Sequence, residues 1–381
     1  MSSPWPAFTI VSLACLATSC QASRRVEVHL FGGDTTESAP LAPWYREIGI
    51  TDVWLYTLKG AFPQDQAPET QRSAEDLAAA GVLDAYRANR IRYWWFERPV
   101  PDVLYTRPEF GDMTQLGSHP IGIVSPSSGL PRIEIVSPNC LWDDAPAADA
   151  AWEEVCRRVA EIYPQVKAAG FEGLVYDNEA YYSYQGDEKG DEKPWVWGGH
   201  ADQYGPKGGY HRRGLQVGRA IHAVWPRAKV IMVYAFGYEG ERWWYQGFAD
   251  AGLRVYLGPE HTYGAGPGDL GDAWYQSWWQ GRRTKETCDW KRTQFPFVTS
   301  NQRVIAGLFP IDFGARKPNY RARYFREQLA SAANDDPAGP IAVWLWPQGP
   351  FTPESWQEVE YADGETAANY LRALREYSAG G

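Results

Sequence analysis

Two carboxylates at alternate positions end a short apolar run, and their spacing suits acid–base chemistry. Residues 171–179 read Phe-Glu-Gly-Leu-Val-Tyr-Asp-Asn-Glu. Side chains in a strand alternate between two faces, so Asp177 and Glu179 are predicted to point the same way. Repulsion between neighbouring carboxylates raises the pKa of one of them, which is what a general acid needs near neutral pH.

A structural role for the same residues is helix capping, because Asp and Asn are good N-caps. The helical pattern resumes only near Tyr210, after a stretch rich in aromatic residues and glycine. The sequence therefore favours a functional site over a helix cap.

The elements that must position these acids alternate along the chain between short apolar runs and helical patterns. Expected strands cover residues 26–31, 52–56, 91–96, 171–179, 230–236, 254–257, 303–309 and 341–346. Expected helices cover residues 44–48, 74–89, 148–169, 210–224, 242–251, 270–280, 319–333 and 364–377. Eight strands alternating with eight helices predict an α/β fold of the (β/α)8 TIM-barrel type, as one domain over residues 24–381.

A doubly wound open sheet is the competing architecture. It would place a glycine-rich dinucleotide turn after the first strand, but Phe31-Gly32-Gly33-Asp34 lacks the third glycine of that motif. No nucleotide or other cofactor is expected.

Two long insertions interrupt the alternation. Residues 100–146 are predicted to form a hairpin subdomain, with β-like runs at 121–124 and 132–136, and residues 181–209 form a loop rich in Trp, Tyr and Gly. Long loops in a compact fold are usually functional. In a barrel these loops, after strands 3 and 4, would lie over the C-terminal mouth, where active sites of this fold occur.

Acidic and aromatic residues stand at most of the expected strand ends. Besides the Asp177–Glu179 pair, the residues expected at the mouth are His29, Phe31, Tyr56, Lys59, Trp95, Glu97, Arg98, Tyr234, Glu239, Glu260, His261, Asp312, Trp344 and Trp346. Aromatic faces stack on sugar rings, and carboxylates accept hydrogen bonds from hydroxyl groups, so this set suits a polyhydroxylated ligand. Substrate contacts are expected from Tyr56, Trp95, Glu97, Asn178, Tyr234, His261, Asp312 and Trp346.

Cleavage of a glycosidic bond needs two carboxyl groups across that bond. Glu179 is the expected proton donor, and Asp177 would raise its pKa and orient a substrate group. Glu260, two strands away, is the expected second carboxylate, although a capping or salt-bridge role would also explain it. Asp312 is three strands away with a shorter reach, and Glu97 has Arg98 or Lys59 as alternative partners. Trp346 is expected either beneath a sugar ring or in the core.

The segment that ends in Asp177 and Glu179 resembles the fourth-strand signature of glycoside hydrolase family 18. The resemblance implies that Glu179 is the acid/base and that Asp177 supports the substrate's acetamido group, which acts as internal nucleophile. Trp346 would match the family's eighth-strand Trp. The chain departs from the signature at Glu172 and Val175, where the family has Asp. It also lacks the sixth-strand Tyr-Asp pair and has Pro-Glu-His at residues 259–261.

The Asn178-Glu179 pair also resembles the end of the fourth strand in the large retaining clan of (β/α)8 glycosidases. That clan places its nucleophilic Glu after the seventh strand, where this chain has Asp312. Both resemblances imply Glu179 as acid/base in a sugar-cleaving barrel. They indicate a divergent glycoside hydrolase.

Two other functions fit parts of the pattern. A metal-dependent hydrolase could use His29, His261, Asp177 and Glu260 as ligands, although the His-x-His pair that often opens such barrels is missing. A non-catalytic glycan-binding barrel could use Trp195, Trp197 and Trp346 for stacking, since a fold does not imply turnover.

The composition and charge of the chain indicate which classes of molecule it can bind. The chain has 381 residues, a formal net charge of −10, 19 Trp and 23 Tyr. A net negative chain without a run of basic residues repels phosphate backbones, so a nucleic-acid partner is not expected. A carbohydrate partner fits the aromatic content.

The N-terminal residues are predicted to form an export signal over residues 1–20. Residues 8–17 are apolar but too few to span a bilayer. Ala17-Thr18-Ser19-Cys20 resembles a lipoprotein cleavage box, with Cys20 as the lipid anchor in the membrane. A plain secretory signal and a cytoplasmic protein with an apolar start are the alternatives. We expect a periplasmic or cell-surface protein.

Three cysteines remain after such processing, namely Cys140, Cys156 and Cys288. Three allow one disulfide at most, and no two have the spacing of metal ligands.

Overall fold

The computed structural model describes residues 26–33, 35–56, 59–62, 71–97, 105–106, 133–134, 146–178, 204–235, 237–263, 284–295, 304–333, 341–362 and 364–379. The predicted export signal with Cys20, most of the two insertions including Trp195 and Trp197, Arg98 and Cys140 lie outside these residues. So does Glu179.

Eight parallel strands form one sheet in the described part of the chain. They are β1 (Val26–Gly33), β2 (Asp52–Leu55), β3 (Arg92–Glu97), β6 (Leu174–Asp177), β7 (Lys229–Tyr234), β8 (Arg254–Pro259), β9 (Ala306–Leu308) and β12 (Ile341–Leu345). Their spatial order is β8-β7-β6-β3-β2-β1-β12-β9. Leu257 of β8 bridges in parallel to Val304, just before β9, and the Ile305 amide donates to the Leu257 carbonyl at 2.7 Å. This seam brings the two edges together, and the predicted (β/α)8 barrel is confirmed.

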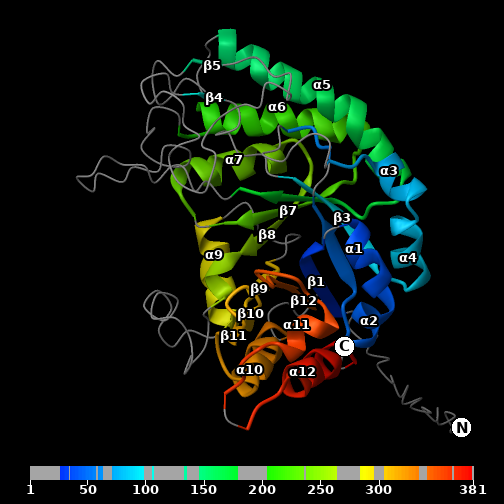
Figure 1. Ribbon diagram of the computed structural model, residues 1–381. Helices are drawn as coiled ribbons and strands as arrows, with labels where there is room; N and C mark the ends of the chain where they lie inside the picture. The colour runs from blue at the N-terminus through cyan, green and yellow to red at the C-terminus, as the bar shows by residue number, and fades with distance from the viewer. Residues whose placement is uncertain are drawn as a thin grey trace, which may run out of the picture.

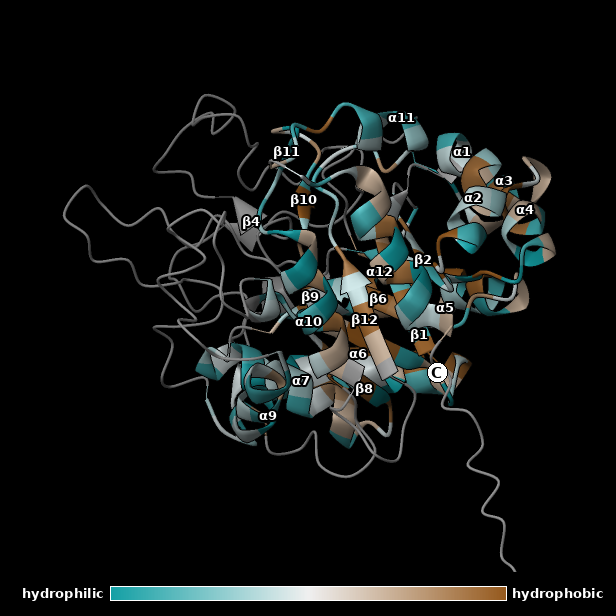
Figure 2. Cartoon of the chain, turned by 90° about the horizontal axis from the view of Figure 1, so that it is seen from below, coloured by the Kyte–Doolittle hydropathy of each residue, from teal (hydrophilic) through white to brown (hydrophobic). Residues whose placement is uncertain are grey.

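Helices follow the strands and surround them (Figure 1). They are α1 (Thr35–Ser38), η1 (Ala39–Leu41), α2 (Ala42–Glu47), α3 (Ala74–Ala79), α4 (Val82–Ala88), α5 (Pro146–Ala168), α6 (Gly209–Val224), α7 (Glu239–Asp250), η9 (Glu260–Thr262), α9 (Thr284–Gln294), α10 (Ala322–Ala333), α11 (Pro353–Gln357) and α12 (Ala367–Ala379). Figure 2 shows hydrophobic strands at the centre and hydrophilic residues on the helices around them. Within the described residues, no helix combines the length and the apolar character needed to cross a bilayer.

One described helix was not expected from the sequence. Residues 270–280, predicted as helical, lie outside the described residues and stay a prediction, and the α-helix described between β8 and β9 is α9. Its buried positions are Thr284, Thr287, Cys288 and Lys291, which are mostly polar. Helices are recognised in a sequence from apolar residues that recur every three to four positions. A helix whose inner face is polar lacks this recurrence, so the method does not detect it.

Two small sheets lie outside the barrel. Strand β4 (Tyr105–Thr106) pairs in parallel with β5 (Ile133–Glu134), so the run predicted at 132–136 takes part in a parallel pair with β4. The other predicted strand of this insertion, residues 121–124, lies outside the described residues, so the hairpin stays a prediction. Strands β10 (Ile311–Asp312) and β11 (Lys317–Pro318) form an antiparallel hairpin after β9.

The wall of the barrel separates two hydrophobic cores, because strand side chains alternate between its faces. The larger core lies between strands and helices and includes Val28, Leu30, Trp95, Tyr176 and Met232. The smaller one, named here the interior cluster, is made by Trp54, Trp94, Phe96, Val175, Ile231, Val233, Tyr256, Tyr263, Ile305, Phe309, Ala342 and Trp344. Phe31, Tyr56 and Trp346 pack against the interior cluster and are partly exposed.

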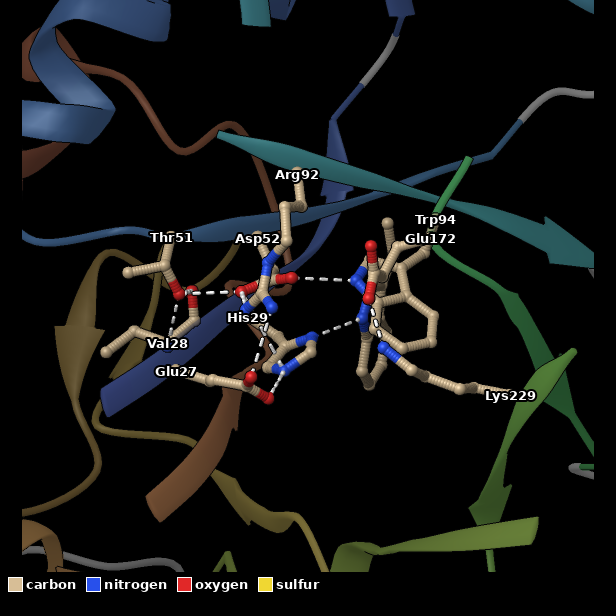
Figure 3. Close-up of polar contacts among 10 residues, drawn as sticks. Glu27, Val28, His29, Thr51, Asp52, Arg92, Trp94, Glu172 and Lys229 are labelled. Carbon is tan, nitrogen blue, oxygen red and sulfur yellow. Dashed lines mark hydrogen bonds and ion pairs between the residues drawn. The ribbon is translucent and has the colours of Figure 1, made fainter. Parts of the chain in front are cut away.

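A buried ionic network occupies the N-terminal end of the barrel (Figure 3). Arg92 contacts Asp52 at 2.6 Å and Glu27 at 3.1 Å. The other oxygen of Asp52 accepts a hydrogen bond from the Trp94 indole at 2.8 Å. His29 lies one layer further in, where its Nδ1 accepts from the Trp54 indole at 3.1 Å.

The bond to Trp54 defines the state of the imidazole. Since Nδ1 accepts a hydrogen bond, the ring proton of His29 lies on Nε2. That nitrogen is 3.6 Å from a Glu27 oxygen and 4.0 Å from an Asp52 oxygen. The Arg92 guanidinium therefore offsets part of the charge of the two carboxylates, and the Nε2–H of His29 faces both of them.

The network predicts a large difference between a buried and an exposed aspartate. Asp52 is fully buried and bonded to Arg92, Trp94 and Thr51, so Asp52→Ala removes one of the two carboxylate partners of Arg92 and leaves the buried indole N–H of Trp94 without its acceptor. We expect the free energy of unfolding to fall by about 3–5 kcal/mol, measured by urea denaturation.

The matched control is Asp84→Ala, which removes an exposed ion pair with Arg87. Its expected loss is below about 1 kcal/mol. Equal losses of unfolding free energy in Asp52→Ala and Asp84→Ala would contradict a stabilising role for the ionic network at the N-terminal end of the barrel.

Candidate active site

Asp177 occupies the C-terminal end of β6 and faces the barrel interior. Val175, two residues earlier on the same face, belongs to the interior cluster, and Asp177 is only 2% exposed. Its register partner on the neighbouring strand is Val233, also an interior residue. A carboxylate is thus held at the end of the barrel where this fold keeps its active sites. Glu179 lies outside the described residues, so its direction stays a prediction.

Partly exposed aromatic residues surround the same end of the barrel. Trp346, directly after β12, stacks on Phe309 with ring centroids 5.5 Å apart and an interplanar angle of 23°. It also lies 5.4 Å from the ring of Tyr263 and 6.3 Å from that of Phe31. Trp346 and Tyr56 therefore stand where the sequence places substrate contacts, and a packed set of rings holds the Trp346 indole in one orientation.

Four other residues expected at the mouth face the helices instead. Trp95 is fully buried in the outer core, and Tyr234 is 4% exposed in the same core. Glu97 and Asn178 are fully buried, and their side chains bond to groups outside the barrel interior. The reason is the strand alternation: Trp94 and Phe96 point inward, so their neighbours Trp95 and Glu97 point outward.

Glu97 anchors the connection that follows β2. Its two carboxylate oxygens accept hydrogen bonds from the amides of Ala61 and Phe62, each at 3.1 Å, and from the indole of Trp95. The Gly60 backbone approaches so closely that a Cβ built there would lie 2.3 Å from the Glu97 carboxyl carbon. Burial raises the pKa of Glu97 to about 7, and the three hydrogen bonds oppose that rise.

Asn178 holds the end of β6 against the helix layer. Its amide nitrogen donates to the Tyr245 hydroxyl of α7 at 3.2 Å and to the Tyr176 carbonyl at 3.1 Å. Because Asn178 stands between Asp177 and Glu179, these bonds fix the backbone between the two acids.

The remaining predicted residues lie after other strands. Glu260 begins η9, directly after β8, and is partly exposed. His261 belongs to the same turn, and its side chain lies outside the described set. Asp312 lies in the β10–β11 hairpin, where its carboxylate accepts a hydrogen bond from the Ala315 amide at 2.8 Å. This turn-forming bond accounts for an acid at that position.

The metal-dependent alternative uses His29, His261, Asp177 and Glu260, and the side chain of His261 lies outside the described residues. Among the residues that the structure describes, no three His, Cys, Asp or Glu side chains form a group that could hold a metal ion. His29 is fully buried and its Nδ1 is bonded to Trp54. Cys156 and Cys288 are both free thiols, and burial raises the pKa of Cys156 to about 11, which makes it unreactive.

Sequence reasoning missed three polar residues behind β6 and β7. They are Glu241 and Tyr245 of α7 and Lys291 of α9, all fully buried. A signal was present for one of them: residues 241, 244, 245 and 248 share one helical face, and Glu241 is the only charge among Trp244, Tyr245 and Phe248. A carboxylate on an otherwise aromatic face predicts a buried partner.

Solved structures that resemble this chain do so with TM-scores below 0.5. No protein-family model matches the chain, and no curated protein matches it. Solved structures similar to it include a Bacteroidetes-affiliated GH5 cellulase linked with a polysaccharide utilization locus (TM-score 0.49, 10% identity, covering 92% of this chain and 90% of that one). Others are a GH5-4 broad specificity endoglucanase from Clostridium acetobutylicum (0.47, 12%, 92% and 97%) and endo-glycoceramidase II from Rhodococcus sp. (0.44, 14%, 92% and 78%).

These neighbours are glycoside hydrolases. At such identities and TM-scores the likeness assigns neither a function nor a residue to this chain, and the barrel is defined by the pairing of its own strands. The resemblance of residues 171–179 to family 18 stays a prediction.

The environment of Glu97 predicts a pH dependence of stability. A raised pKa means that the folded state holds the proton more tightly than the unfolded chain, so the group's contribution is full at low pH and is lost as pH rises toward about 7. In Glu97→Gln an amide NH2 would face an N–H donor, which costs about 1–3 kcal/mol at every pH. We therefore expect wild type to be more stable than Glu97→Gln at pH 5, and the gap to narrow by pH 8.

Urea denaturation across this pH range measures the gap. Glu327→Gln, an exposed change on α10, is the control and should follow wild type at all pH values. A gap that widens with pH would refute the proposed environment of Glu97.

Proposed function

We propose that this protein is a glycoside hydrolase whose proton donor is Glu179. The observation that carries the proposal is Asp177, a carboxylate that faces the barrel interior at the C-terminal end of β6, two residues before Glu179. The partly exposed rings of Tyr56 and Trp346 at the same end offer stacking surface for sugars.

In the proposed reaction, Glu179 gives its proton to the glycosidic oxygen as the bond to the leaving sugar breaks. The negative charge of Asp177 disfavours ionisation of Glu179, which keeps the proton available near neutral pH. Asp177 also accepts a hydrogen bond from the sugar that becomes positively charged. Glu260, directly after β8 and partly exposed, is the second carboxylate. It either bonds to the anomeric carbon, in an intermediate that water then hydrolyses, or takes a proton from a water that attacks this carbon directly, so that a hydroxyl group replaces the leaving sugar.

The family 18 resemblance offers a different partner for Glu179, an acetamido group of the substrate itself. One variant distinguishes the mechanism that uses Glu260 from the mechanism that uses the acetamido group. Glu260→Gln abolishes turnover if Glu260 is the second carboxylate and leaves it intact if the acetamido group attacks.

The central test replaces the proton donor. We expect Glu179→Gln to lower kcat for a hydrolysed glycan by at least about a thousandfold, because general acid catalysis is lost together with charge control at the bond. Glycan binding, measured by calorimetry, should persist since the amide is isosteric with the acid. Glu327→Gln should retain wild-type kcat. Retained turnover in Glu179→Gln would contradict the assignment.

The same experiment distinguishes the other functions. Binding of glycans by wild type, with no hydrolysis of any glycan in a broad panel, would indicate a glycan-binding barrel. Turnover that a chelator abolishes and a divalent cation restores would indicate a metal-dependent hydrolase.

Trp346 should contribute to substrate binding. Trp346→Ala removes a stacking surface that Phe309 and Tyr263 hold in place, and we expect Kd for the glycan to rise about tenfold, equivalent to about 1.4 kcal/mol. The control is Trp243→Ala, which removes a partly exposed indole from the helix layer on α7. Calorimetry with Glu179→Gln as background measures both. Equal Kd values for Trp346→Ala and Trp243→Ala would show that Trp346 does not contribute to glycan binding.

A further inference from the structure

The backbone at the end of β7 has an uncommon conformation next to the proposed site. Tyr234 and Ala235 have φ angles of +80° and +44°, and Gly237 has +95°. Positive φ is strained at residues other than glycine and persists only where surrounding contacts hold it. Val233, just before this turn, pairs with Asp177, so the shape of the turn borders the candidate active site.

Two buried charged side chains hold this turn from the helix layer. Lys291 of α9 donates from Nζ to the Ala235 carbonyl at 2.6 Å. Glu241 of α7 accepts from the Gly237 amide at 2.7 Å. The bonds act on the carbonyl and the amide of the same turn, and both side chains are fully buried.

The same carboxylate connects the turn to the end of β6. The hydroxyl of Tyr245 lies 2.7 Å from the second oxygen of Glu241 and donates to it, and Asn178 donates to that hydroxyl at 3.2 Å. The Tyr245 ring stacks on Phe295 at 5.4 Å, with an interplanar angle of 18°, which fixes the position of the hydroxyl. A continuous polar chain therefore runs from the turn after β7 to the residue between Asp177 and Glu179.

The charges around Lys291 explain how an ammonium tolerates burial. Glu241 from α7 and Glu260 from η9 face it and raise its pKa, while burial lowers that pKa to about 7, the larger effect. The indole of Trp290 lies 4.6 Å from Nζ. A buried lysine that kept no such partners would be strongly destabilising.

We propose that Lys291 and Glu241 are positioning residues, which hold the turn after β7 and, through Tyr245 and Asn178, set the end of β6 that presents Asp177 and leads into Glu179. The inference rests on the proposed glycosidase function and deepens it. Both act through the backbone that carries the acids. Because Lys291 also faces Glu260, Tyr245→Phe, which changes no charge, separates positioning from an effect of charge. An error of about 1 Å in such a backbone can lower a rate about a hundredfold.

The test compares two lysines of one helix in the full-length protein. Lys291→Met removes the buried ammonium at nearly constant length, and Lys285→Met removes a partly exposed one that pairs with Asp289. Hydrogen exchange of the peptides covering residues 174–178 and 234–241 reports the backbone, and kcat and KM on the glycan of the Glu179 experiment report the site.

We expect Lys291→Met to speed exchange in residues 234–241 by at least about tenfold and to lower kcat by about 10- to 100-fold, with KM nearly unchanged. Lys285→Met should match wild type in exchange and kinetics. Tyr245→Phe removes only the linking hydroxyl, so it should lower kcat in the same way and speed exchange in residues 174–178. Tyr245→Phe also provides the test if Lys291→Met fails to fold.

Wild-type exchange and wild-type kcat in Lys291→Met, or in Tyr245→Phe where the lysine variant does not fold, would overturn the inference. A fall in kcat with unaltered exchange would overturn it as well, because a positioning role requires the backbone to loosen. If wild type hydrolyses no glycan, the proposed function fails, and the exchange rates still decide whether the two residues hold the turn.

Discussion

A closed parallel sheet gives every strand residue one of two surroundings, and this constraint governs the whole molecule. A side chain faces either the narrow interior or the helix layer, and its neighbour in the strand takes the opposite side. Asp177 reaches the interior because it follows Val175 by two residues. Asn178 must then face the helices, where Tyr245 provides a partner for its amide. One strand end thus combines a carboxylate for chemistry with an amide that holds the backbone.

Polar groups occupy both ends of the barrel in different ways. At the N-terminal end, Arg92 lies between Glu27 and Asp52, and each of these charges has an opposite partner. At the C-terminal end the buried charges lie behind the sheet, at Glu97 and around Lys291, where they bond to backbone amides and a carbonyl. The first arrangement stabilises the barrel floor, and the second shapes the connections that leave the strands.

The architecture could be predicted from the sequence because the barrel strands contain short apolar runs and the longer helices α6, α7, α10 and α12 each have an apolar face. The faces of β3 could not be predicted in the same way. Residues 93–96 read Tyr-Trp-Trp-Phe, so both sides of the strand are aromatic and hydrophobicity cannot distinguish inside from outside. Trp95 and Glu97 were therefore expected at the mouth, whereas they pack against the helices.

Contacts between residues far apart in the chain could not be predicted from the sequence for another reason. Lys291 and Ala235 are 56 residues apart, and nothing in the polar pattern of α9 indicates that its lysine is buried. Asp312 was expected at the site because it follows the seventh strand, but the hairpin it supports is formed by residues that hydrophobic patterning does not identify.

The close approach of Gly60 to Glu97 has an evolutionary consequence. Any side chain at position 60 would occupy the space of the Glu97 carboxyl group. Homologous chains that have lost glycine there should also have a smaller residue at position 97 and another means of holding the segment after β2. The two positions are therefore expected to covary, although 37 residues separate them in number.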